Sequence, residues 1–492
     1  MYILDAKSKI ENHFARLRSM LEGGRRKWLW TAIAAWLALG VDSQADLPVC
    51  EGRKIYVLDI GIFAEQQAMP ACNPDTTFRV DPITNVPFLH DDPQVKNAYL
   101  PQYLGQYSGP WHLAQAIKSS PYVTTDLDAA DIVYVYDYCY YTWWLSFVHS
   151  NGRVQREDAT PGDHLLKGYQ ALIQTPRWQR HEGADFVFYD PHPGFGTGRA
   201  EMPVIDMMCN TFRNAMHIVA ERTQRNVCQN YWTMAPKLLI VPYVPATSDI
   251  ARPLKGFQMK VTPANERHIM LWFRTKCLPY IMEGQGRYVN GHRFCHHVAI
   301  ALGKAGLDVD VSCTDRQLGG RPLPFRSIME RMRNATFCLS MPGDSASTRR
   351  LSETIMAGCI PVFVGPPFAS MPLAEHVNYR EFSVFFNVSD YSGWLQDSME
   401  WGIHPTIRPY HVLNPWTWIP ELEVNDIAIK VDNASSIAGH LRYMDKKEIL
   451  HKLDMLAVER QKFSFQPFIT GPFSAINIIM SSMCNITLPT KA

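Results

Sequence analysis

Several features that identify common protein classes are missing from this chain. None of its eleven cysteines stands in a Cys-x-x-Cys or other zinc-like spacing, so no structural metal is expected. Lysine and arginine outnumber aspartate and glutamate only by 48 to 47. This balance provides no electrostatic basis for binding nucleic acid or an anionic membrane. Internal repeats and low-complexity segments are absent as well. We therefore expect a globular protein without a nucleic-acid partner.

The sequence also lacks a charge-free apolar run of ~20 residues, the length that spans a bilayer. A shorter charge-free stretch, 28–41, follows the basic cluster Arg25-Arg26-Lys27 and precedes Ser43-Gln44-Ala45, which has the small-x-small form of a cleavage site. This order is typical of a signal peptide, and an uncleaved signal-anchor fits it as well. We expect residues 1–27 to be a cytosolic tail and residues 50–492 to lie in the secretory pathway.

Disulfides form in that oxidising environment. Cysteines close in sequence are the simplest candidates, and the sequence predicts the pairs Cys50–Cys72 and Cys209–Cys228. Cys338 and Cys359 fall in expected buried strands and are predicted to be free thiols.

The length of 492 residues favours two domains. Apolar strands alternate with helices in both halves, and a linker rich in proline, threonine, serine and charge lies at 245–267. The expected strands are 54–60, 129–136, 183–190, 238–244, 268–273, 307–313, 335–341, 359–364 and 383–388; the expected helices are 111–119, 165–177, 293–302, 345–357, 392–403 and 435–464. Alternation of this kind predicts an α/β protein with two Rossmann-like, doubly wound sheets. We assign 50–250 and 251–440 to these domains and 441–492 to a C-terminal helical segment.

One stretch, 337–368, combines strand, turn, helix and strand. Pro342-Gly343-Asp344-Ser345 is a turn cluster, and Ser345 or Ser347 is the expected cap of a helix that ends near Ala357. Gly358 stands where a helix end favours a left-handed residue. A helix N-terminus at the edge of a sheet is a natural phosphate site because its backbone N–H groups are free.

Two charged residues on that helix suit a nucleotide. Arg350 and Glu353 are three residues apart and so share a helix face. A guanidinium matches a phosphate, and a carboxylate can accept hydrogen bonds from both hydroxyls of a ribose. The hydroxyls of Ser345, Ser347 and Thr348 add donors. The alternative is a surface ion pair between Arg350 and Glu353.

The segments Phe-Cys-Leu, Pro-Gly-Asp-Ser, Arg-Leu-x-Glu and Gly-Cys-Ile-Pro-Val, at these spacings, closely resemble the signature of exostosin-like glycosyltransferases, glycosyltransferase family 47. The resemblance implies the GT-B fold, in which two Rossmann-like domains face a cleft, and inverting transfer from a nucleotide sugar, mostly a UDP-sugar, to a glycan or glycoprotein. It also implies a Golgi-lumen location, as a type II membrane protein or after signal cleavage. Arg350 and Glu353 match the nucleotide-binding Arg-x-x-Glu of the family. Arg274 or Lys276 matches a basic residue near the diphosphate, and Arg293 matches a family arginine only loosely.

Inverting transfer needs a base that takes the acceptor proton and groups that stabilise the leaving diphosphate. We expect the base in the N-terminal domain, where His192 is the leading candidate and Asp190, Asp137 and the run His90-Asp91-Asp92 remain open. The sequence Asp126-Leu-Asp128 has the metal-binding form Asp-x-Asp, but it stands before a strand and is predicted to be a solvated turn. We therefore expect catalysis without a metal cofactor. A silent pseudo-transferase that binds sugar or nucleotide sugar is the alternative function. The donor sugar, the acceptor and a homo- or hetero-oligomeric state stay open.

Overall fold

The computed structural model describes part of the chain. The described residues are 50, 52–63, 78–80, 87–89, 106–137, 161–191, 207–221, 237–245, 261–275, 290–313, 323, 325–343, 346–366, 368–389, 421–465 and 473–486. All of them belong to one unit, Cys50–Ala492. The predicted cytosolic tail, the stretch 28–41 and the expected helix 392–403 lie outside the described residues.

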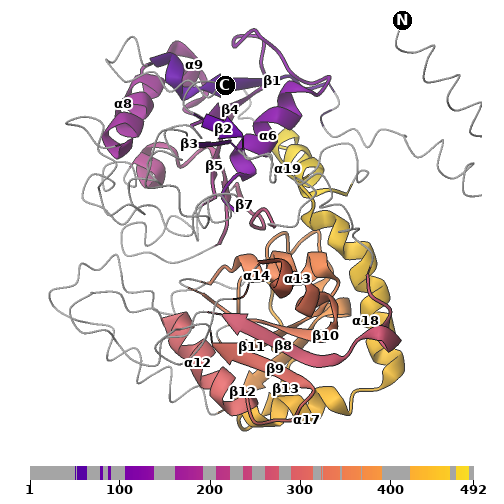
Figure 1. Cartoon of the computed structure of the whole chain (residues 1–492). Helices are drawn as coiled ribbons and strands as arrows, with labels where there is room; N and C mark the ends of the chain where they lie inside the picture. The colour runs from indigo at the N-terminus through magenta and orange to yellow at the C-terminus, as the bar shows by residue number, and fades with distance from the viewer. Residues whose placement is uncertain are drawn as a thin grey trace, which may run out of the picture. The chain divides into compact units, whose positions relative to one another are not determined.

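The N-terminal sheet has five parallel strands in the spatial order β1-β4-β5-β6-β7. They are β1 (Ile55–Asp59), β4 (Ile132–Tyr136), β5 (Phe186–Asp190), β6 (Met216–Val219) and β7 (Leu238–Ile240). The helices of this half are α6 (Gly109–Lys118), α8 (Pro161–Ile173) and α9 (Pro176–His181), and β2 (Phe78–Val80) and β3 (Pro87–Leu89) form a separate antiparallel pair. These elements are drawn from indigo to magenta in Figure 1.

Helices cover both faces of this sheet. Side chains alternate between the two faces along each strand, so each strand packs against helices on both sides. Val133 and Val135 of β4 pack in a cluster with Leu165 of α8 and Trp178 of α9. Tyr134, between them, points the other way and donates a hydrogen bond from its hydroxyl to the Pro110 carbonyl oxygen of α6, at 3.0 Å.

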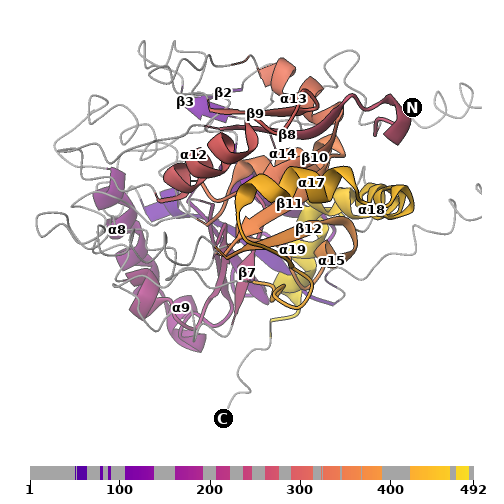
Figure 2. The same cartoon turned by 90° about the horizontal axis from the view of Figure 1, so that it is seen from below.

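The C-terminal sheet has six parallel strands in the order β13-β12-β11-β10-β8-β9. The strands are β8 (Ile269–Thr275), β9 (Val309–Cys313), β10 (Ala335–Ser340), β11 (Ile360–Gly365), β12 (Val384–Val388) and β13 (Ile429–Val431). The helices are α12 (Asn290–Leu302), α13 (Phe325–Arg333), α14 (Arg349–Ala357), α15 (Tyr379–Phe382), α17 (Ile437–Arg442), α18 (Lys446–Glu459) and α19 (Ala475–Cys484). Figure 2 shows α17 followed by α18 beside this sheet.

Here too the alternation along a strand separates two cores. Leu271 and Phe273 of β8 pack with Val298 of α12 and Ile437 of α17. Trp272, between them, packs on the other face with Met329 of α13, Ala357 of α14 and their neighbours. The predicted α/β fold of two Rossmann-like, doubly wound sheets is confirmed.

The strand order contains a reversal between β8 and β10. The chain passes from β8 to its neighbour β9 on one side and then crosses back, so that β10 pairs with β8 on the other side. Such a reversal opens a crevice at the carboxyl ends of the two strands, and this is where open α/β sheets bind ligands.

Two predicted helices are each divided in two. The expected helix 165–177 breaks before Pro176, because the Thr175 hydroxyl accepts the Trp178 N–H at 3.2 Å and caps a new helix, α9. The expected helix 435–464 breaks between α17 and α18, where the Asp445 carboxylate accepts the Lys447 N–H at 3.1 Å.

The disulfide predictions need correction. Cys50 is bonded to Cys484 of α19, not to Cys72, and α19 packs against α6. Cys338 and Cys359, predicted to be free, are bonded to each other, with Cα atoms 5.8 Å apart on the adjacent β10 and start of β11. Sequence distance failed as a guide because tertiary packing joins the distant segments. The side chains of Cys209 and Cys228 lie outside the described part.

Candidate active site

The carboxyl ends of β8 and β10 carry the groups expected to meet a diphosphate. β8 ends with Arg274 and Thr275, and β10 ends at Ser340, from where the chain continues to α14. Parallel neighbours end at the same edge of a sheet. Arg274 and the N-terminus of α14 therefore flank the crevice at the strand reversal.

The cap of α14 differs from the prediction. Thr348 is the N-cap, and its hydroxyl oxygen accepts the Arg350 N–H at 3.3 Å; Ser347 lies one residue earlier, and Ser345 is outside the described residues. The other end is as predicted. Gly358 is left-handed, with φ +75°, and a Cβ atom there would lie 3.0 Å from the Val261 side chain. The backbone conformation favours glycine, and a larger residue would also press on the Val261 side chain.

Arg350 and Glu353 have separate partners. The Glu353 carboxylate is buried and lies 2.7 Å from Nε of Arg349, four residues earlier on the helix. The Arg350 guanidinium lies over two rings of β8, 5.8 Å from the Trp272 ring centre and 6.0 Å from that of Phe273. Burial lowers the pKa of Arg350, whereas Glu353 nearby acts to raise it.

One guanidinium nitrogen of Arg350 lacks a hydrogen bond. This atom, Nη1, is buried and has no hydrogen-bond partner among the described residues. A buried, unmatched donor on a cation costs free energy unless an anion or another acceptor satisfies it. This atom is therefore suited to an anionic ligand at the carboxyl end of β8.

Ser347 contacts the N-terminal half of the chain. Its backbone N–H donates to the Glu221 carboxylate at 2.6 Å, and its hydroxyl lies 2.7 Å from the Tyr243 hydroxyl. Glu221 follows β6 and Tyr243 follows β7, so both reach out from the carboxyl edge of the N-terminal sheet. The sequence interpretation did not include Glu221. A signal was present, since the short run 215–220, apolar except for His217, ends directly before this acidic residue.

Three carboxylates lie at neighbouring strand ends of the N-terminal sheet. Asp59 ends β1, Asp137 follows β4 and Asp190 ends β5. Burial, with a smaller contribution from the charge of Asp59, raises the pKa of Asp137 to about 6, although a hydrogen bond from the Tyr169 hydroxyl opposes the shift. Of the predicted base candidates, Asp137 and Asp190 are thus at the expected edge.

The remaining predicted positions divide into two groups. Asp126 and Asp128 form the predicted exposed turn: Asp126 Oδ1 accepts the N–H groups of Asp128 and Ala129, and Asp128 pairs with Arg180 at 2.7 Å. The other positions lie outside the described residues, and their predicted roles stay predictions; they are His90, Asp91, Asp92, His192, Lys276 and the side chain of Arg293.

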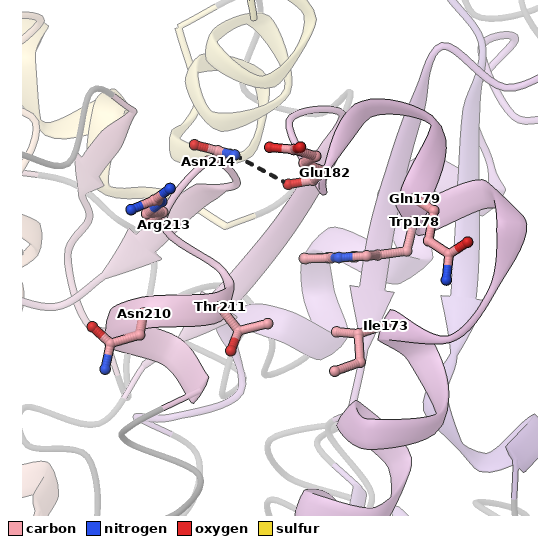
Figure 3. Close-up of a pocket in the computed structure, with 8 residues that line it drawn as sticks. All are labelled: Ile173, Trp178, Gln179, Glu182, Asn210, Thr211, Arg213 and Asn214. Carbon is pink, nitrogen blue, oxygen red and sulfur yellow. Dashed lines mark hydrogen bonds between the residues drawn. The ribbon is translucent and has the colours of Figure 1, made fainter.

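A pocket of about 450 Å³ lies elsewhere in the N-terminal half (Figure 3). Its lining comes from α8, α9 and the segments that lead into β5 and β6: Ile173, Trp178, Gln179, Glu182, Asn210, Thr211, Arg213 and Asn214. In Figure 3 the Asn214 side chain donates to the Glu182 carbonyl oxygen, at 3.4 Å. The pocket thus lies at the amino ends of these strands, opposite the edge that carries Asp190 and Glu221.

Within the described part of the chain, no group of three or more histidine, cysteine, aspartate or glutamate residues could hold a metal ion. None of the helices described is long and apolar enough to cross a membrane.

Comparison with known proteins gives a family. The family model described as "Exostosin GT47 domain" matches residues 49–395. Three relatives are similar over shorter segments. "Probable xyloglucan galactosyltransferase GT14" of Arabidopsis thaliana is 40% identical over 70 residues, 14% of this chain and 13% of that protein. "Xyloglucan galactosyltransferase MUR3" of the same plant is 39% identical over 66 residues, 13% and 11% of the two chains.

A longer similarity is to "Probable glucuronosyltransferase Os01g0926400" of Oryza sativa subsp. japonica, 25% identical over 221 residues, 44% of this chain and 46% of that protein. The chain thus spans less than half the length of each of these relatives. Among solved structures, "OtsA apo structure" aligns with 89% of this chain and 100% of that chain, at 10% identity and a TM-score of 0.35.

Proposed function

Because the chain belongs to the exostosin GT47 domain family, we propose that it is a glycosyltransferase that moves a sugar, with inversion, from a UDP-sugar to a glycan or glycoprotein. The observation that carries the proposal is the strand reversal between β8 and β10, beside which α14 presents its N-terminus and Arg350 a buried nitrogen without a hydrogen-bond partner. The positive end of a helix dipole and a guanidinium together suit a diphosphate.

Each part of the donor has a matching group. The diphosphate lies at the N-terminus of α14, near Arg350 and Arg274. The Glu353 carboxylate accepts hydrogen bonds from the ribose hydroxyls, and Arg349, 2.7 Å away, fixes its orientation. Lys276, Arg293 and Ser345 are proposed to complete the donor site on the strength of the family resemblance. Ser347 joins the donor site if a phosphate oxygen of the donor replaces Glu221 as the acceptor of the Ser347 N–H.

During transfer the acceptor oxygen attacks the anomeric carbon, and the bond to the diphosphate oxygen breaks with its electron pair on the phosphate. The growing negative charge lies at a helix N-terminus and beside a guanidinium, which stabilise it without reorganising. These groups support a metal-independent reaction.

The names of the relatives indicate which donors to test first. They describe galactosyl- and glucuronosyltransferases, and two of the names include xyloglucan. We propose a hexose or hexuronic acid donor and a cell-wall-type polysaccharide acceptor. The purified protein should release UDP slowly, with water as acceptor, from one of UDP-galactose, UDP-glucuronic acid, UDP-galacturonic acid, UDP-xylose, UDP-arabinose and UDP-N-acetylglucosamine. UDP binding without release from any of them would favour the pseudo-transferase.

We also propose that the chain works in the Golgi lumen, held by residues 28–41 or freed by cleavage after them. The basic cluster before 28–41 and the disulfides Cys50–Cys484 and Cys338–Cys359 support this, since disulfides persist in the secretory pathway and are rare in the cytosol. Translation with microsomes tests it: residues 50–492 should be protected from added protease. A fully digested chain would contradict the proposal.

A further inference from the structure

The side chain of Glu221 joins the two halves of the candidate site. It follows β6 at the carboxyl edge of the N-terminal sheet and is 5% exposed. Its Oε2 atom accepts the Ser347 N–H at 2.6 Å. Ser347 directly precedes Thr348, the N-cap of α14. A carboxylate from the N-terminal half therefore lies at the turn where the proposed function places the donor diphosphate.

The base of an inverting transfer must meet two conditions. It needs a group that can take up a proton, and it must reach an acceptor hydroxyl placed against the anomeric carbon. That carbon is one oxygen atom away from the outer phosphorus of a nucleotide sugar. A carboxylate beside the diphosphate turn is thus within side-chain reach of the reacting atoms, and it approaches from the half opposite the nucleotide helix.

The other described carboxylates at this edge are less well placed. Asp137 follows β4, which lies two strands from β6, about 10 Å at the usual strand spacing. Its carboxylate also accepts a hydrogen bond from Tyr169. Asp190 ends β5, one strand from β6. Glu221 contacts the segment before α14 directly, through the Ser347 N–H.

We propose that Glu221 is the general base of the transfer reaction, an inference that rests on the proposed function. The acceptor O–H proton moves to the Glu221 carboxylate while the acceptor oxygen forms its bond to the anomeric carbon. The bond from that carbon to the diphosphate oxygen breaks, and its electron pair stays on the UDP. The Ser347 N–H holds the carboxylate in place until the donor arrives.

The electrostatics of the site favour this direction of proton transfer. The leaving diphosphate gains negative charge close to a carboxylate, and like charges at short range disfavour each other. Protonation of Glu221 in the same step removes one of the two charges. The arrangement thus couples the departure of the leaving group to the deprotonation of the acceptor.

Glu221→Gln tests the assignment because the amide oxygen can still accept the Ser347 N–H but cannot take a proton. The substrate is the UDP-sugar from which the wild type releases UDP fastest. We expect kcat to fall about 10²- to 10⁴-fold, the usual contribution of a general base, while UDP binds at least as tightly in calorimetry. Glu221→Asp keeps a titratable group and should recover at least about tenfold over the glutamine variant.

Tyr243→Phe is the matched control, since it removes the other contact to Ser347 and leaves Glu221 intact. It should lower kcat by no more than about tenfold, the effect of one neutral hydrogen bond. Near-wild-type kcat in Glu221→Gln would overturn the assignment. So would a parallel loss of UDP binding, or equal kcat in the glutamine and aspartate variants, because either result describes a structural contact.

Failure of the two proposals can be told apart. If the wild type releases UDP but Glu221→Gln does so equally well, only the assignment of the base is wrong. If the wild type releases UDP from none of the six UDP-sugars, the proposed reaction itself is wrong, and Glu221 cannot be its base.

Discussion

Arg349, and not Arg350, is the ion-pair partner of Glu353, with 2.7 Å between Nε and Oε1. The two residues are four apart, the spacing at which helical side chains meet. Arg350 is turned instead toward Trp272 and Phe273 of β8 and has an unmatched Nη1 atom. The carboxylate and the guanidinium of the Arg-x-x-Glu motif are thus available for different parts of one ligand.

The Cys338–Cys359 disulfide closes the unit of β10, α14 and β11. Replacing both cysteines by alanine should lower the free energy of unfolding by about 3 kcal/mol, as estimated for a cross-link of this span. Denaturant unfolding of the unreduced protein measures the change. Cys295→Ala, which changes a buried free thiol, is the control and should cost less. Alkylation of both Cys338 and Cys359 in unreduced, denatured protein would show that the bond does not exist.

The raised pKa of Asp137 predicts a pH dependence of stability. The folded value of about 6 exceeds the usual value of about 3.9. Between these values the folded state holds more protons at Asp137 than the unfolded state, so the contribution of Asp137 to stability falls as pH rises from about 4 to 6 and is flat above. The loss is about 3 kcal/mol at most. Asp137→Asn should remove this slope and raise the melting temperature at pH 7; an unchanged slope would show that Asp137 is not its source.

Removal of divalent ions should leave the reaction unaffected. The charge on the leaving diphosphate is assigned to Arg350, Arg274 and the N-terminus of α14, so UDP release should continue at its normal rate in EDTA. If EDTA abolished the activity and manganese restored it, the proposed metal independence would be wrong.

Much of the fold could be predicted from the sequence because its signals are local. Continuous apolar strands such as Ile132–Tyr136 indicate a sheet covered on both faces. Gly358 ends α14 because its conformation favours glycine, and the sequence shows this directly. Strand order is different, since it depends on crossovers that periodicity does not record. The reversal between β8 and β10 was therefore not predicted.

Only the nucleotide-binding part of the candidate site could be predicted, because its residues lie in one continuous stretch of the sequence. Arg350 and Glu353 lie on one helix, so their spacing carried the inference. Glu221 lies 126 positions before Ser347 in the chain, and its contact is created by tertiary packing. The pairing of Glu353 with Arg349 was missed for a smaller reason, because positions three and four apart lie on the same helix face and only the side-chain rotamers choose between them.

The most direct test of the account is calorimetric titration of UDP into the wild type, Arg350→Ala and Glu353→Gln. Loss of a hydrogen bond to a charged group costs about 1.5–3 kcal/mol, so affinity should fall roughly ten- to a hundredfold. Arg350→Ala should have the larger effect because it also removes a cation. Arg380→Ala, which breaks an exposed ion pair with Asp426, is the control and should bind UDP normally. If Arg350→Ala and Glu353→Gln both bind UDP like the wild type, the nucleotide does not bind at α14 and the central claim is wrong.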